Sequence, residues 1–274
     1  MGMKNGDINW DKVDVVINPA GKEMSDNILH DVQHAPFRLK YQVLRYIDHA
    51  ETEWYRLDAF LPFSFKSAWI KTEQEVNCKG WEAYALERLN SALRAKYSEI
   101  KKRDAKNRQR FFAFKELIGG DAIDEEKARI LYATCLNHGE DHDYIDDTIK
   151  ETVGDLRNKL DKIASDPVEN QDCKLNYAKF VKMLVNDKCH YCDISVEQIL
   201  KLSEKYQLFT KRSRGYCMEV DQLNAYDFYH DDNCEASCYW CNNAKTDEFS
   251  DIEFQKTKPG FKAIWYERLE NRGL

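Results

Sequence analysis

Two closely spaced pairs of cysteines constrain this chain more than any other feature of its sequence. Cys189 and Cys192 form one Cys-x2-Cys pair, and Cys238 and Cys241 form a second. Each pair can turn two thiolates inward from one tight turn, and two such turns together place four sulfurs at the corners of a tetrahedron. Structural zinc prefers that arrangement. We therefore predict a zinc site that organises the segment from 189 to 245.

The rest of the sequence favours a metal over disulfide bonds. The opening segment lacks the apolar stretch of a secretory leader, and no apolar run approaches the length of a membrane span. We therefore expect a cytoplasmic, reducing location without membrane association, where paired cysteines indicate a metal. The chain has nine cysteines, and we expect the other five to be packed or free thiols: Cys78, Cys135, Cys173, Cys217 and Cys234.

Residues 1–170 are predicted to form a mainly helical domain. We expect a short strand at Val13–Ile17, and then a helix that starts at Pro36 and continues to about Phe60. This helix is predicted from apolar residues at helical spacing, namely Leu39, Val43, Tyr46 and Ile47. A long helix follows Gly80, with an apolar stripe made by Leu86, Leu89, Leu93, Tyr97 and Ile100.

The end of the long helix is basic over residues 101–110. This stretch could follow a phosphate backbone, or it could be a solvated helix face whose cations favour a helix C-terminus. The net charge of −7 argues against a uniformly basic surface but allows a local basic segment. Gly119 and Gly120 end the helical pattern, and Asp124 can cap a further helix through about Leu136.

The next segment ends the predicted helical domain. Residues 138–147 combine His138 and His142 with several acids, which suggests either a metal site or a polar loop before a helix. An amphipathic helix is expected over 145–163. Residues 165–172 read as a linker, and we place the domain boundary there.

The C-terminal part, residues 171–274, is predicted to hold short helices and two strands around the cysteines. Helices are expected at Tyr177–Leu184, at Val196–Tyr206 with Ser195 as N-cap, and from Cys238 to Lys245, with a helical tail beyond. Strands are expected at Phe209–Arg212 and Met218–Leu223. The fold class is thus mainly α, with a zinc-bound ββα module and a helical tail at 171–274.

The order and spacing of residues over roughly 188–250 resemble a known family. Asp221-Gln222 ends a strand, Asn233 follows in the middle, and Asn242 comes directly after the last cysteine, with Lys245 three positions on. In this pattern the module resembles the HNH nucleases, in the form stapled by zinc through two Cys-x2-Cys pairs. The resemblance implies a β-hairpin followed by a helix, with a catalytic divalent ion between them.

The resemblance also implies roles for individual residues. Asp221 and Asn242 offer hard oxygens that suit Mg²⁺ or Mn²⁺. The family has a histidine as general base where this chain has Gln222, and an amide cannot accept that proton. His230 or Glu219 could act as base instead, Gln222 could merely position the water, or the site could be inactive. Contacts with DNA are expected from Lys211, Arg212, Arg214 and Lys245, without sequence readout.

Two functions follow as expectations. The first is an HNH-like endonuclease that cleaves DNA phosphodiester bonds, in a restriction or phage-defence setting that the resemblance implies. The alternative is a catalytically inactive zinc module that binds protein or nucleic acid as a subunit of a complex. In both cases the helical region could bring a protein partner.

Overall fold

The computed structural model describes the chain in several stretches. The described residues are 3, 5–25, 28–29, 32–33, 36–62, 64–71, 78–137, 162, 173–185, 188–204, 208, 215–225 and 227–271. The chain divides into two compact units. Unit 1 comprises Met1–Lys96, Tyr177–Asp221 and Glu235–Leu274, and unit 2 comprises Tyr97–Asn176 and Gln222–Cys234.

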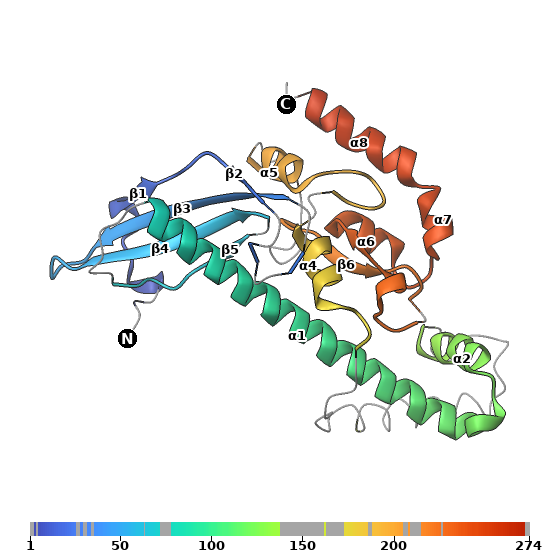
Figure 1. Ribbon diagram of the computed structural model, residues 1–274. Coiled ribbons are helices and arrows are strands. Elements are labelled where there is room, and N and C mark those ends of the chain that lie inside the picture. The colour runs from blue at the N-terminus through green and yellow to red at the C-terminus, as the bar shows by residue number, and fades with distance from the viewer. Residues whose placement is uncertain are drawn as a thin grey trace. The chain divides into compact units, whose positions relative to one another are not determined.

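A five-stranded sheet forms the first part of unit 1 (Figure 1). Its strands are β1 Val13–Ile17, β2 Lys22–Met24, β3 Phe37–Ile47, β4 Glu53–Leu61 and β5 Phe65–Lys66. The order is β1-β3-β4-β5, β2 also pairs with β3, and all of these pairs are antiparallel. The strand expected at Val13–Ile17 is therefore confirmed.

The helix expected from Pro36 to Phe60 is wrong, because this stretch forms β3 and β4. Phe37, Leu39, Tyr41 and Val43 are buried at alternate positions of β3. This period of two is typical of a strand, and aromatic and β-branched residues favour it. Asp48 then closes the turn into β4, because its side chain accepts hydrogen bonds from the backbone N–H groups of Ala50 and Thr52, each at 2.9 Å.

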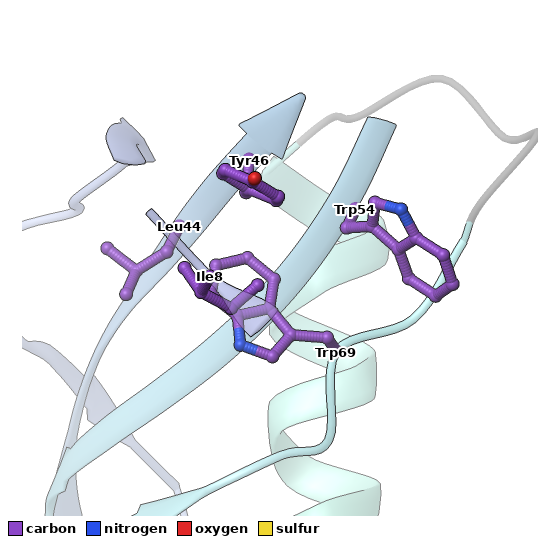
Figure 2. Close-up of a cluster of buried hydrophobic side chains, with 5 residues drawn as sticks. All are labelled: Ile8, Leu44, Tyr46, Trp54 and Trp69. Carbon is purple, nitrogen blue, oxygen red and sulfur yellow. The ribbon is translucent and has the colours of Figure 1, made fainter. Parts of the chain in front are cut away.

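A cluster of buried apolar side chains packs against this sheet. It contains Ile8, Leu44, Tyr46, Trp54 and Trp69. Tyr46 and Trp54 are cross-strand partners on β3 and β4, and Figure 2 shows Ile8 and Trp69 packed together beside Leu44. Cross-strand aromatic pairs of this kind stabilise a sheet.

The long helix predicted after Gly80 is confirmed as α1, Cys78–Ile118, which continues from unit 1 into unit 2. Leu89 and Leu93 of the predicted apolar stripe are fully buried. Helix α2, Glu125–Asn137, follows, and Asp124 caps it as expected by accepting a hydrogen bond from the Lys127 N–H at 3.0 Å. In unit 2, Phe111 of α1 and Ala128 of α2 share a buried cluster with Phe228.

The C-terminal part holds short elements around the cysteines. They are α4 Tyr177–Val185, α5 Val196–Glu204, β6 Glu219–Gln222, β7 Cys234–Ser237, α6 Tyr239–Lys245, α7 Asp251–Gln255 and α8 Lys258–Glu270. The expected helices and the strand around 218–223 are confirmed, and Ser195 caps α5 by accepting a hydrogen bond from the Gln198 N–H at 3.1 Å. Short 3-10 helices lie at Asn5–Asp7, Trp10–Lys12, Gly120–Ala122 and Asp231–Asn233.

Within the described residues, β6 pairs with β7 in a two-stranded sheet, a pairing that the sequence did not indicate. The hairpin expected between Phe209–Arg212 and Met218–Leu223 stays a prediction. Several predictions concern residues outside the described ones and stay predictions. They are the strand at 209–212, the segment 138–147 with its histidines and acids, the amphipathic helix over 145–161 and the linker 165–172. None of the described helices is both long and apolar enough to cross a membrane.

Candidate metal centre and adjoining polar site

The first cysteine pair lies on a tight turn closed by backbone hydrogen bonds. The Cys189 N–H donates to the Ile194 carbonyl at 3.0 Å, and the Asp193 N–H donates to the Cys189 carbonyl at 3.0 Å. Asp193 has a φ of 59°, in the left-handed region that a turn this tight requires. The turn directs both sulfurs to the same side.

The second pair lies at the start of α6. Cys238 is the N-cap, and its Sγ accepts a hydrogen bond from the Cys241 N–H at 3.4 Å. The Cys238 N–H in turn donates to Cys189 Sγ at 3.2 Å, which joins the two pairs directly. N–H groups that point at sulfur stabilise a thiolate.

All four sulfurs meet in one buried cluster. Their ligand atoms lie within 4.8 Å of one another, and Cys192 Sγ is 3.7 Å from Cys238 Sγ. Hydrogen bonds from Cys192, Cys238 and Cys241 hold the pKa of Cys189 well below its usual range, so the cluster favours a thiolate at that position. Four buried sulfurs could hold a metal ion such as zinc, because thiolate is the ligand that tetrahedral zinc prefers. Cys173, Cys217 and Cys234 are not part of this cluster, as expected.

A polar site adjoins the cysteines, where β6 packs against α6. Glu219 and Asp221 are two positions apart on β6 and so share one face of the strand. Asn242 and Lys245 are three positions apart on α6 and share one face of the helix. The Asn242 amide nitrogen donates to Glu219 Oε2 at 2.7 Å, and Lys245 Nζ lies 3.4 Å from Asp221 Oδ2.

Asp221 has two partners that the sequence did not suggest. Besides Lys245, the Tyr191 hydroxyl donates to Asp221 Oδ2 at 2.6 Å. Burial raises the pKa of Asp221, while the Tyr191 hydrogen bond and the Lys245 charge act in the opposite direction. Burial, followed by the hydrogen bond to Asp221, raises the pKa of Tyr191. Tyr191 stands between Cys189 and Cys192 in the sequence, so the turn that positions the two sulfurs also positions a partner for Asp221.

The helical tail attaches to the same cysteine turn. His190 Nε2 lies 3.1 Å from Asp251 Oδ1 and 2.7 Å from the Gln255 side-chain nitrogen, both on α7. Asp193 forms ion pairs with Lys258 and Lys262 of α8 at 3.1 and 2.9 Å. The hydrogen bond from Lys262, together with that from Lys258 and the charges of both lysines, holds the pKa of Asp193 below its usual range.

Three further sequence-predicted site residues belong to unit 2: Gln222 at the end of β6, and His230 and Asn233 beyond it. The side chain of Asn233 is buried, and it accepts from the Asn224 N–H at 2.8 Å and donates to the Asn224 and Phe228 carbonyls at 3.0 Å each. Gln222 donates its side-chain amide to the Asp227 carbonyl at 2.6 Å. These two residues therefore close the loop. His230 Nε2 lies 2.9 Å from Asp227 Oδ2.

The expected DNA contacts need one correction. Lys245 is 1% exposed and paired with Asp221, so its ammonium is not available to a phosphate. A helix facing a strand buries this residue, which a charge count along the sequence cannot reveal. Lys211, Arg212 and Arg214 lie outside the described residues.

The basic segment 101–110 also has a packing role within unit 2. Arg108 is 12% exposed, donates to Asp104 Oδ2 at 2.7 Å and covers the Phe228 ring at 4.1 Å. Lys102, Arg103 and Lys106 are exposed. The segment thus combines a solvated face with a buried one.

Comparison with known proteins adds one structural likeness. No family model matches the chain, and no curated protein matches it. Among solved structures the chain is similar to the rare-cutting HNH restriction endonuclease PacI, with a TM-score of 0.31 and 21% identity, over 43% of this chain and 79% of that chain. A likeness at this level does not establish a shared fold, so the chemistry of the site rests on its own residues.

Proposed function

We propose that the β6–β7–α6 module is an HNH-like, metal-dependent nuclease module that cleaves DNA phosphodiester bonds. The observation that carries the proposal is the meeting of Glu219 and Asp221 on β6 with Asn242 and Lys245 on α6, on a helix that starts at the four-cysteine cluster. A zinc ion held by the four sulfurs would fix the start of α6 and thereby the distance between helix and strand.

Asp221 and Asn242 are the residues that would hold a hard divalent cation, Mg²⁺ or Mn²⁺. Because the Asn242 amide nitrogen donates to Glu219, its amide oxygen is directed away from that carboxylate. Such a cation, when bound, supplies polarisation of the scissile phosphate and stabilisation of the departing 3′-oxygen. Lys245 and Tyr191 hold Asp221 in a single orientation beside α6.

The general base in this proposal is His230. Gln222 is engaged with the Asp227 carbonyl, and Glu219 is engaged with Asn242. His230 is an imidazole whose Nε2 faces the Asp227 carboxylate, which holds the ring N–H at that atom and leaves Nδ1 to accept a proton. In the hydrolysis, water gives a proton to the general base as its oxygen bonds to phosphorus, the bond to the 3′-oxygen breaks, and the departing oxygen takes a proton from solvent.

A plasmid-nicking assay tests the proposal. Wild type is compared with Asp221→Ala and Asn242→Ala in Mg²⁺, in Mn²⁺ and in EDTA, with zinc content measured on each sample. Asn243→Ala is the matched control, because Asn243 is the exposed neighbour of Asn242 on the same helix. We expect metal-dependent nicking by wild type and Asn243→Ala and its loss in the other two. Absence of nicking by wild type with any metal, at full zinc content, would overturn the proposal.

A second candidate is a catalytically inactive zinc module that binds nucleic acid or a protein partner. The ion pair of Asp221 with Lys245 favours it, because Asp221 is already neutralised by a buried ammonium. In this case no metal restores nicking, and DNA binding or capture of a partner subunit persists in Asp221→Ala. A restriction or phage-defence setting is proposed for the nuclease candidate on the family resemblance alone.

A further inference from the structure

Within unit 2, the loop between β6 and β7 contacts residues of α1 and α2. Phe228 of the loop is buried with Phe111 of α1 and Ala128 of α2. Asp104 of α1 is fully buried and accepts a hydrogen bond from the Tyr229 N–H at 2.8 Å. Asp104 also accepts from Arg108 Nε at 2.7 Å, so its buried charge is balanced, and its bond to the Tyr229 N–H fixes the main chain at that point.

Arg129 of α2 contacts the same loop through an ion pair and a cation–π interaction. Its guanidinium lies 4.4 Å from the centre of the Phe228 ring, and its Nη1 is 2.9 Å from Asp227 Oδ1. Its Nη2 is 2.6 Å from Glu125 Oε1 on the same helix. The Arg129 side chain is 18% exposed, so neither the ion pair with Asp227 nor the contact with the ring is fully open to solvent.

Asp227 connects Arg129 to His230, because it contacts both side chains. One carboxylate oxygen, Oδ1, receives Arg129 and also the Phe228 N–H at 2.7 Å, while the other, Oδ2, faces His230 Nε2 at 2.9 Å. Burial raises the pKa of Asp227, but the His230 and Phe228 hydrogen bonds and the Arg129 charge outweigh it and lower the pKa overall. Asp227 is therefore held as a carboxylate in one rotamer.

His230 lines a cavity of about 570 Å³ in unit 2. The charged groups of the cavity come from every element around it: Arg108 of α1, Glu125 and Arg129 of α2, Lys174, and Asp227, Asp231 and Asp232 of the loop. Their charges are of both signs and several are paired with each other, so the lining does not single out an anionic ligand. What distinguishes His230 among them is the fixed chain of contacts behind its ring.

We propose that Arg129 is a positioning residue, which acts through Asp227 to fix the tautomer and the orientation of the His230 ring at this cavity. The proposal rests on the proposed function in that it gives His230 the task of accepting a proton. A carboxylate with both oxygens fixed keeps the imidazole N–H at Nε2, so Nδ1 stays the acceptor. Without the guanidinium, Asp227 can rotate and the ring loses its preferred tautomer.

The test compares Arg129→Gln, Arg129→Lys and Asp227→Asn in the full chain. Glu125→Gln is the matched control, because it removes the ion pair of Arg129 within α2 and leaves the contact with Asp227. ¹⁵N NMR of histidine-labelled protein reads the His230 tautomer, with the signal assigned by its loss in His230→Asn. Nicking kinetics give kcat and KM separately, and zinc content and melting temperature report on folding.

We expect the Nε2–H tautomer in wild type and Glu125→Gln, and a mixture of tautomers in Arg129→Gln and Asp227→Asn. We also expect kcat to fall by about 10-fold to 100-fold in these two variants with KM unchanged, within the contribution that a general base makes. Arg129→Lys should recover part of both effects. If Arg129→Gln does not fold, Arg129→Lys and Asp227→Asn still decide, because each keeps a side chain of similar size.

An unchanged His230 tautomer in folded Arg129→Gln or Asp227→Asn overturns the positioning role. An altered tautomer in a protein whose wild type does not nick DNA supports the positioning role and overturns the nuclease proposal. A fall in kcat with an unchanged tautomer places Arg129 in another role and overturns the inference.

Discussion

Replacement of Lys245 by methionine tests the buried ion pair between β6 and α6. Lys245 Nζ is 3.4 Å from Asp221 Oδ2, and the two side chains are only 1% and 8% exposed. Methionine keeps most of the length of the lysine stem and removes the charge. Asp221 then remains buried with the Tyr191 hydroxyl as its hydrogen-bond donor at 2.6 Å.

The expected cost follows from the distance and the burial. At an effective dielectric constant of about 20, two unit charges at this separation attract by about 5 kcal/mol. Measured losses for one partner of a buried pair are about 3–5 kcal/mol. The protein can limit the loss by protonating Asp221, which costs about 4 kcal/mol at pH 7 for an ordinary aspartate. We therefore expect Lys245→Met to lower the free energy of unfolding by about 3–4 kcal/mol at pH 7.

The pH dependence of this cost tests whether the buried charge of Asp221 causes it. Removal of the ammonium raises the pKa of folded Asp221 further above the unfolded value of 3.8. A raised folded pKa contributes stability that is present below the unfolded pKa and is lost as pH rises through the folded pKa. The cost of Lys245→Met should therefore be larger at pH 8 than at pH 6, by about 1–2 kcal/mol.

Urea denaturation followed by circular dichroism, at saturating zinc, measures both quantities. Lys262→Met is the matched control, since its pair with Asp193 is 39% and 40% exposed and solvent screens it. The double variant Asp221→Asn with Lys245→Met should cost less than the sum of the two single variants. If Lys245→Met costs no more than Lys262→Met, or if its cost does not change with pH, the ion pair does not stabilise the packing of β6 against α6.

Three further predictions concern other parts of the chain. Cys238→Ala should lose bound zinc by elemental analysis, whereas Cys234→Ala should keep it, because Cys234 is buried outside the four-sulfur cluster; equal zinc in both variants would contradict the site. Asn233→Ala should lower the urea-unfolding free energy by about 2–4 kcal/mol through the loss of three loop hydrogen bonds, and Asn224→Ala much less. Burial, partly opposed by the Arg110 charge, raises the pKa of Tyr132 from 10.0 to about 12, so stability should fall as pH rises through that range. Tyr132→Phe should reduce that slope in denaturation curves, and an unchanged slope would argue that the phenol is not buried on folding.

Features that depend on neighbouring residues could be predicted from the sequence. The two cysteine pairs predict a metal site, because the cysteines of each pair lie on one tight turn and a cluster of thiolates is a site for a metal ion. Asp124 and Ser195 marked the starts of α2 and α5 because a cap bonds to N–H groups two or three positions away. The long helix α1 was predicted from its apolar stripe, because that stripe is a pattern of residues three or four positions apart.

The helix predicted over β3 and β4 is wrong because the apolar residues of β3 fit both the spacing of a helix and the alternation of a strand. Leu39, Val43, Tyr46 and Ile47 fit a helix, while the buried run at Phe37, Leu39, Tyr41 and Val43 fits a strand. Local spacing alone does not separate a buried strand from a helix. Pairing with β1 on one side and β4 on the other decides that the stretch is a strand, and β1 lies far from β3 in the sequence.

By itself, the sequence determined that this chain gathers four sulfurs and that helices and strands surround them, because such features depend on residues close together in the chain. Only the tertiary structure decided that Lys245 lies buried against Asp221, and that Asp104 and Arg129 hold the loop carrying His230. The physical reason is that a charge acts on whichever groups the fold brings within a few ångströms. In water each of these side chains would remain solvated, and burial turns them into specific partners.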